Sequence, residues 1–218
     1  TEKLELHWRL TQAAGREFNL TAIRDRAEAI DKHYIDSLLA LPVLAKLPPP
    51  GGAPLQAADS APLRAADIGS GAGFPSLPLA LARPDISWTL LEATAKKAAF
   101  LERAAQELGL EQGRVRVLAL RAEQAGHEPS LRARFDLATA RAVAPLAVLA
   151  EYALPLLKSG GFLLAYKGPE AAAELREAER ALLLLGGAAR PELSGTLSLP
   201  YGRRERVVNE KAGRTPDK

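Results

Sequence analysis

The segment ADIGSGAGFPSLPLALARPD, residues 66–85, decides how this chain is interpreted. It joins a short apolar run to a leucine-rich one through three glycines at alternate positions, Gly69, Gly71 and Gly73, with Asp67 shortly before them. A glycine-rich turn between a strand and a helix lets a ligand approach the backbone closely, because glycine has no Cβ and readily adopts positive φ. A tight turn without a ligand fits the same pattern, so its meaning depends on the surrounding chain.

The chain from residue 64 onward alternates between short apolar runs and helical patterns. The apolar runs are RAADI, ISWTLLE, RVRVLAL, FDLATAR and FLLAY, and helical stretches such as AKKAAFLERAAQELG and PEAAAELREAERALLLL lie among them. Such alternation predicts an α/β fold in which a parallel sheet is covered by helices on both faces. The later stretch TLSLPYGRRERVVNEK predicts two strands joined through Pro-Tyr-Gly, as a hairpin on the edge of the sheet.

The first residues, 1–46, predict a small helical N-terminal lobe. In NLTAIRDRAEAIDKHYIDSLLALPVL, Asp25 and Glu28 have the spacing of a capping box, and apolar residues then recur every three or four positions. Residues 47–63 are rich in Pro, Gly and Ala and predict a linker. The predicted main domain covers residues 64–211, and residues 212–218 are left as a tail.

Composition and charge limit the classes of protein that fit. The 218 residues carry a net charge of +3, which permits a polyanionic partner without requiring one. The sequence contains no cysteine, which excludes disulfides, thiolate metal sites and thiol nucleophiles. The first residues, TEKLELHWRL, lack the features of a signal peptide, and no apolar run reaches membrane-spanning length. We therefore expect a soluble, cytoplasmic protein without membrane contacts.

Glu92 helps to identify the ligand of the glycine loop, because it ends the next apolar run, nineteen residues after Gly73. A carboxylate there can accept hydrogen bonds from ribose hydroxyls, which both dinucleotides and S-adenosylmethionine carry. The G-x-G-x-G spacing favours S-adenosylmethionine, and so does Asp67, which would repel a pyrophosphate but attract an ammonium and a sulfonium. A P-loop is excluded because no Gly-Lys-Ser/Thr follows. A nicotinamide-dependent oxidoreductase remains the alternative from another class.

Several motifs occur in an order that is specific to one bacterial family. They are NLTAI, HYIDSLL, DIGSGAGFPSLPLA, LLEATAKKAAFLE, LRAEQA, ARAVAPL and AYKGP, and the similarity as a whole runs from about Asn19 to Lys211. In these motifs the chain resembles the glucose-inhibited division protein B family, also called ribosomal small-subunit methyltransferase G. The resemblance implies a Rossmann-like S-adenosylmethionine-dependent methyltransferase fold and methylation of N7 of one guanine in 16S ribosomal RNA. The expected partner is 16S rRNA or the small ribosomal subunit, and we expect a monomer.

The cofactor site expected here combines the residues of the glycine loop with positions that the resemblance implies. Asp67, Gly71 and Gly73 come from the loop itself. The resemblance implies a further set: Gly69, Phe74, Glu92, Ala93, Thr94, Ala122, Glu123 and Arg141. Ser76 stands where the family usually has glycine, and Glu92 replaces a frequent aspartate.

The expected chemistry needs no catalytic side chain. Guanine N7 carries an exposed lone pair and no proton, so alignment of the nucleophile, the methyl group and the leaving sulfur is enough. His33, Asp36 and Ser37 share a helix face, but no G-x-S-x-G elbow supports a hydrolase, and a structural role is the better interpretation.

RNA contacts are expected from Lys167, at the end of a predicted strand, and from Arg204, which matches a basic position in the family. No metal site is expected, because His7 and His127 lack neighbouring ligands in the sequence. A methyltransferase of the same fold that acts on another substrate remains an alternative.

Overall fold

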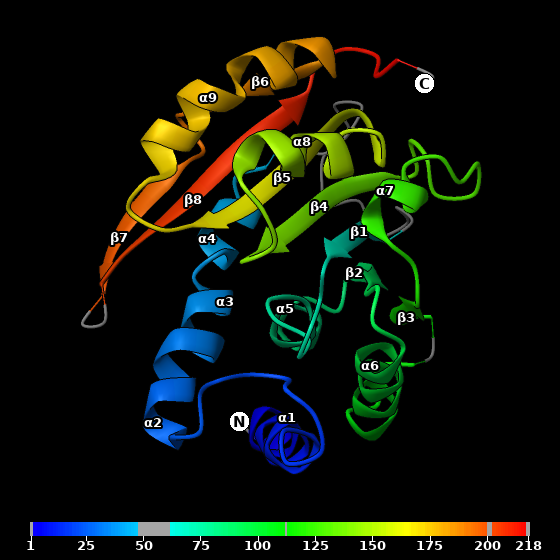
Figure 1. Ribbon diagram of the computed structural model, residues 1–218, viewed down its shortest axis with the longest axis vertical. Coiled ribbons are helices and arrows are strands. Elements are labelled where there is room, and N and C mark those ends of the chain that lie inside the picture. Colours follow the sequence, from blue (N-terminus) through cyan, green and yellow to red (C-terminus); the bar gives the residue numbers. More distant parts are fainter. Residues whose placement is uncertain (1, 48–61, 112, 200–201, 217–218) are drawn as a thin grey trace.

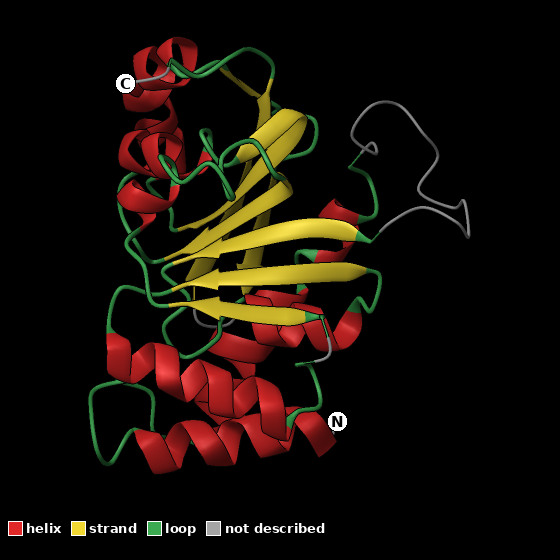
Figure 2. Cartoon of the chain, turned by 90° about the vertical axis from the view of Figure 1, so that its right-hand side faces the viewer, coloured by secondary structure: helices red, strands yellow, loops and turns green. Residues whose placement is uncertain are grey.

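A twisted parallel sheet forms the centre of the protein, in a computed structural model that describes residues 2–47, 62–111, 113–199 and 202–216. The parallel strands lie in the order β3-β2-β1-β4-β5, and their carboxyl ends point to one edge, as the arrowheads in Figure 2 show. Their bounds are β1 (Leu63–Ile68), β2 (Ile86–Leu91), β3 (Val115–Leu118), β4 (Phe135–Arg141) and β5 (Leu157–Lys167). The predicted strand-helix alternation is confirmed.

The antiparallel strands extend this sheet beyond β5. β8 (Gly202–Lys211) pairs with β5 on one side, while β6 (Gly187–Ala189) and β7 (Gly195–Leu199) pair with its other side. The predicted pairing of the two C-terminal strands is confirmed, but of these two strands β7 lies at the edge and β8 does not, because β8 is inserted between β5 and β7. Residues 200–201 of the predicted Pro-Tyr-Gly connection lie outside the described residues.

Helices cover both faces of the sheet, as Figure 1 shows. One face carries α7 (Ala122–Ala125), α8 (Leu146–Ala153) and α9 (Ala171–Leu184), which share a buried apolar cluster with β4 and β5. The other carries α1 (Glu2–Ala14), α5 (Ser76–Ala82) and α6 (Ala95–Glu107) over a second cluster. No helix in the described part of the chain has the length and apolar character needed to cross a membrane.

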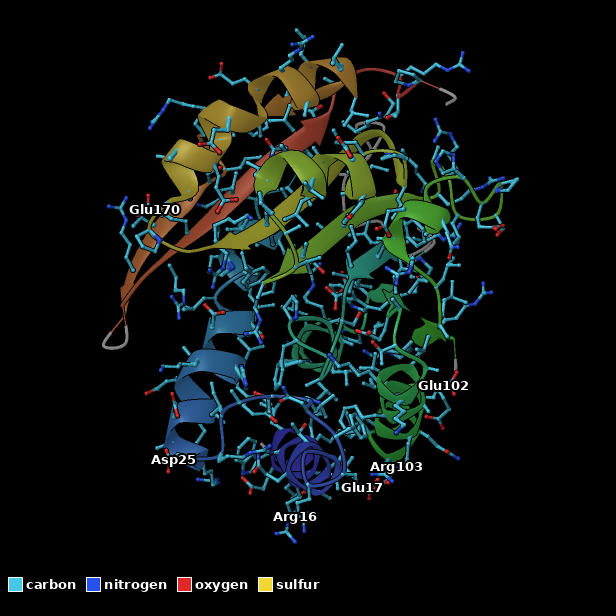
Figure 3. The ribbon with its side chains drawn as sticks, in the orientation of Figure 1. Arg16, Glu17, Asp25, Glu102, Arg103 and Glu170 are labelled. Atoms are coloured by element: carbon cyan, nitrogen blue, oxygen red, sulfur yellow. The ribbon has the colours of Figure 1, made fainter. Side chains whose placement is uncertain are left out.

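The segment after α1 is helical but interrupted. Asp25, labelled at the outer end of α2 in Figure 3, accepts a hydrogen bond from the Glu28 backbone N–H at 2.8 Å, so the Asp25 half of the predicted capping box is present, while the Glu28 carboxylate accepts from Lys32. The turns that follow are α2 (Arg26–Ala29), a π-helical segment η1 (Ile30–Ile35), α3 (Asp36–Leu38) and α4 (Leu41–Leu44). The wider π turn rotates the buried face, which leaves Ile30 exposed and Tyr34 buried.

The N-terminal helices share the core of the main domain. Trp8 and Tyr34 belong to the same apolar cluster as Leu77 and Leu101 of α5 and α6. The division into a lobe and a domain stays a prediction, since residues 48–61 of the predicted linker lie outside the described residues. Leu63 of that linker already belongs to β1. The effect of this packing is that the segment from α2 to α3 is held beside the carboxyl ends of the strands.

Candidate functional site

The glycine loop leaves β1 at the carboxyl edge of the sheet. The N–H groups of Gly69 and Ser70 both donate to the carbonyl of Leu91, at 2.9 and 3.2 Å, and join the loop to the end of β2. Gly69, Gly71 and Gly73 have φ values of +66°, +54° and +88°, a region that L side chains rarely adopt. The loop therefore depends on glycine for its conformation.

The surroundings of the three glycines differ. A Cβ on Gly69 would lie 2.8 Å from Val143, and one on Gly73 would lie 2.4 Å from Leu77, so these two permit close packing within the protein. A Cβ on Gly71 would meet nothing closer than the Gly69 carbonyl oxygen at 3.9 Å. Gly71 is thus the glycine at which the loop offers open backbone to a ligand.

Two carboxylates flank the loop. Glu92 accepts hydrogen bonds from the Gly71 N–H at 3.0 Å and from the Thr94 N–H at 2.9 Å, so it ties the loop to the start of α6. Asp67 is fully buried in β1; Oδ1 accepts from the Thr139 hydroxyl at 2.7 Å, and Oδ2 has no hydrogen-bond partner among the described residues. Burial raises the pKa of Asp67, with hydrogen bonds from neighbouring hydroxyls opposing the shift.

Phe74, predicted to contact the cofactor, is enclosed by side chains from the N-terminal segment. The His33 ring stacks on it with centroids 4.5 Å apart, His7 lies 5.0 Å away, and Tyr34 approaches edge-on at 5.1 Å. The Arg141 guanidinium sits 5.1 Å from the ring centroid. Since Phe74 is only 5% exposed, its contacts join the glycine loop to the N-terminal helices.

Both histidines near Phe74 are neutral. His7 donates from Nε2 to the Ala72 carbonyl at 2.8 Å and accepts from the Tyr34 hydroxyl at Nδ1, while burial lowers its pKa to about 4. Because arginine has only donors, Arg141 Nη2 donates to Nδ1 of His33 at 3.1 Å. The proton of the neutral His33 ring therefore lies on Nε2. Burial, followed by the charge of Arg141, lowers the pKa of His33 to about 4.

A row of aligned residues crosses three strands at the same edge. Arg141 of β4 is in register with Tyr166 of β5, and Tyr166 with Arg206 of β8, which places the three side chains on one face. Arg206 lies 4.1 Å from the Tyr166 ring centroid and binds Asp36 at 2.9 Å. Arg141 donates to the Lys32 carbonyl at 3.1 Å and to Asp36 at 3.2 Å. The π-helical segment and α3 are therefore bound to the strand ends.

A cavity of about 640 Å³ opens between these strand ends and the N-terminal segment. Its charged lining residues are Lys32, Asp36, Arg141, Lys167, Glu174 and Arg204, four cations and two carboxylates with a formal sum of +2. Val143, which lies against Gly69, also lines it. The cavity is therefore cationic and adjoins the glycine loop.

The remaining predicted residues are placed as follows. Ala93 and Thr94 are exposed beside the loop, between β2 and α6. Ala122 and Glu123 open α7, and Glu123 accepts a hydrogen bond from the Tyr152 hydroxyl at 3.0 Å. The Lys167 ammonium binds Glu174 at 2.6 Å and the Ala144 carbonyl at 2.7 Å, which fixes the segment after β4.

Residues that the sequence interpretation left outside the site also lie in it. Asp36 and His33 line the cavity, although their shared helix face was assigned only a structural role. Arg206 of β8, to which the sequence analysis gives no role, binds Asp36 at this site. Among the described residues there is no group of His, Asp and Glu side chains suited to a metal ion.

Comparison with known proteins agrees with this geometry. A solved structure of magnesium protoporphyrin IX methyltransferase from Synechocystis, with bound S-adenosylmethionine, matches with a TM-score of 0.61 at 15% identity over 97% of each chain, which shows the fold. This fold, together with the family match described next, makes the chain a Rossmann-like S-adenosylmethionine-dependent methyltransferase.

The family follows from sequence matches. A family model described as rRNA small subunit methyltransferase G, or GidB, matches residues 1–191. Ribosomal RNA small subunit methyltransferase G of Moorella thermoacetica is 41% identical over 93% of this chain and 78% of its own length. The Deinococcus deserti protein of the same name is 41% identical over 96% of this chain and 80% of its own length. The chain belongs to the rRNA small subunit methyltransferase G family.

Proposed function

We propose that this protein transfers a methyl group from S-adenosylmethionine to N7 of one guanine in 16S ribosomal RNA. The observation that carries the proposal is the position of the cationic cavity directly beside a glycine loop with one open glycine. A polyanion and a nucleoside cofactor can thus occupy neighbouring parts of one site. Family membership supports rRNA as the substrate.

The residues around the loop fit S-adenosylmethionine. Gly71 leaves space over the backbone, and Glu92 has lone pairs beyond the two it uses, which suit ribose hydroxyls. Oδ2 of Asp67 has no hydrogen-bond partner among the described residues, and a cationic ligand on the loop would favour the charged form of this buried carboxyl. Ala93, Thr94, Ala122 and Glu123 would line the adenosine side. When bound, S-adenosylmethionine supplies an electrophilic methyl group on a sulfonium.

The residues that line the cavity support alignment rather than proton transfer. His33 Nδ1 is occupied by Arg141, Asp36 is bound by arginines, and Glu174 is bound by Lys167. The Tyr166 hydroxyl donates to the Ser37 carbonyl at 2.9 Å. Guanine N7 has no proton to lose, so a site whose acids and bases are already engaged suits it. The role of the cavity is to hold the base and exclude water.

RNA binding is assigned to the cationic side of the cavity. Arg204, with 30% of its side chain exposed, is proposed to contact a phosphate, whereas Lys167, at 8%, would act mainly by holding the segment after β4. Arg141 would position the base next to the cofactor. We propose that the protein acts as a monomer in the cytoplasm, on 16S rRNA or on the small subunit.

Two measurements test the proposal. Calorimetry should show binding of S-adenosylmethionine and none of NADH, which separates it from a nicotinamide-dependent oxidoreductase. Incubation with methyl-labelled S-adenosylmethionine and small ribosomal subunits that lack the modification should label 16S rRNA and not the ribosomal proteins. Label in protein, or binding of NADH alone, would reject the proposal.

A further inference from the structure

His33 joins three parts of the site through one imidazole ring. Its Nδ1 accepts a hydrogen bond from Arg141 Nη2 at 3.1 Å, and its Nε2 donates to the Thr21 hydroxyl oxygen at 2.8 Å. The face of the ring stacks on Phe74 with an interplanar angle of 23°. The ring therefore connects the glycine loop, the segment before α2 and the end of β4, and it lies in the wall of the cavity.

The contacts of Arg141 show what the His33 ring adds. Nη1 donates to the Lys32 carbonyl at 3.1 Å and to Asp36 at 3.2 Å, whereas Nη2 donates to His33. A guanidinium group is planar, so the contacts at Nη1 fix its position and the contact at Nη2 fixes the direction of its plane. Three of its five N–H groups are used by the described residues, and two, five minus three, remain for a ligand in the cavity that Arg141 lines.

Thr21 supports the tautomer of His33 that this contact needs. A neutral imidazole carries one proton, and Arg141 can donate only to the ring nitrogen without it, so the proton lies on Nε2. The Thr21 hydroxyl oxygen accepts from that nitrogen, and a further hydrogen bond from the Ile23 backbone N–H, at 3.2 Å, holds the hydroxyl in place. Thr21 and His33 thus form a chain of hydrogen bonds that ends at Arg141.

We propose that His33 is a positioning residue that fixes the plane of the Arg141 guanidinium, so that the remaining N–H groups of Arg141 hold the target base in line with the methyl group. This rests on the proposed function, since it assumes that a base enters the cavity. The stack on Phe74 sets His33, and through it Arg141, against the loop that would carry the cofactor. Methyl transfer depends on alignment, so a change in the direction of Arg141 affects kcat more than it affects cofactor affinity.

His33→Phe and His33→Asn separate the hydrogen bond to Arg141 from the packing of the ring. Phenylalanine keeps a ring on Phe74 but has no acceptor, whereas asparagine keeps an acceptor, Oδ1, near the place of Nδ1 but has no ring. Positioning predicts that kcat for methyl transfer to unmodified small subunits falls about tenfold in His33→Phe and by less than about threefold in His33→Asn. The KM for S-adenosylmethionine should change by less than about twofold in both variants. A structural role of the ring predicts the reverse order, with His33→Asn the less active variant.

Thr21→Val tests the same chain of hydrogen bonds at its other end, and it serves if His33→Phe melts below the assay temperature. The substitution removes the acceptor of Nε2 and leaves the stack on Phe74 in place. We expect kcat to fall about threefold in Thr21→Val and to return to the wild-type value in Thr21→Ser, which keeps the hydroxyl.

Two further measurements isolate the effect on Arg141. In an Arg141→Ala background, His33→Phe should lower kcat by less than about a further twofold, because His33 acts through that arginine. Rotation of the Arg141 guanidinium about its Nε–Cζ bond, measured by NMR on the protein without RNA, should be faster in His33→Phe than in the wild type and unchanged in His33→Asn. An unchanged kcat in His33→Phe or Thr21→Val, a multiplicative loss in the double variant, or equal rotation rates would overturn the proposal. Wild-type protein that fails to label rRNA would instead reject the proposed function, and the rotation rates would still decide whether His33 orients Arg141.

Discussion

Acidification should destabilise this protein through His7, which anchors the glycine loop to α1. Its imidazole is fully buried and bonded on both nitrogens, and its pKa falls from 6.5 to about 4 on folding. A lowered folded pKa means that the unfolded chain binds the proton first, so the stabilisation is complete above pH 6.5 and is lost as the pH falls toward 4.

The magnitude follows from the linkage relation. Between pH 7.5 and pH 5, the shift from 6.5 to about 4 removes about 2 kcal/mol from the free energy of unfolding. His33 has the same shifted value and contributes a similar loss, so the two remove about 4 kcal/mol. For a chain of this size that lowers the melting temperature by about 8 to 16 °C.

Thermal unfolding followed by circular dichroism at pH 7.5, 6.5, 5.5 and 5.0 measures this loss. His7→Gln should be less stable at pH 7.5 but should lose about half of the pH dependence, whereas His127→Gln, at an exposed position, should retain all of it. Burial raises the pKa of Asp67 and works in the opposite direction, so the comparison of variants isolates the histidine effect. An unchanged pH dependence in both His7→Gln and His33→Gln would show that these histidines do not cause the loss of stability.

Three further substitutions test the loop and the cavity. Glu92→Gln should weaken S-adenosylmethionine binding by about 1–3 kcal/mol in calorimetry, because the ribose hydroxyls lose a charged acceptor, and an equal affinity would remove Glu92 from the site. Both Gly71→Ala and Gly73→Ala should lower the melting temperature because of their positive φ, Gly73→Ala by more because its Cβ would also meet Leu77, and Gly71→Ala should in addition weaken cofactor binding by filling open space; unchanged cofactor affinity in Gly71→Ala would contradict the division of roles. Arg204→Ala should reduce the slope of log Kd for RNA against log salt by about 0.7 and leave cofactor affinity unchanged, and an unaltered slope would place Arg204 outside the RNA contact.

The local features of this site could be predicted from the sequence. The glycine loop, the strand before it and the acidic residue after the next strand lie within about thirty residues and are specified by short-range periods and spacing. The cap at Asp25 is local as well, and it is present. Such features can be predicted from a single sequence because each depends on residues that lie close together in the sequence.

The cluster around Asp36 could not be predicted in the same way. It joins residues that lie 105 and 170 positions apart, and the contact depends on the register of β4, β5 and β8. The π-helical turn also changes which side of the N-terminal helix is buried, and the apolar period does not reveal it. The only available signal was the shared face of His33 and Asp36, which suggests proximity but identifies no arginine partner.

Mapping of the methylated atom is the sharpest test of methyl transfer to guanine N7. Small-subunit RNA is methylated by the protein in a single turnover, treated with borohydride and aniline, and read by primer extension. Methylation at N7 places a fixed positive charge on the imidazole ring and makes the glycosidic bond labile, so N7 methylation predicts strand cleavage at one guanine. It also predicts a methyl-transfer rate that is nearly flat between about pH 6.5 and 8.5, since no general base is required. Labelled RNA that resists aniline cleavage, or a rate that falls on the acid side with an apparent pKa near 7, would contradict it.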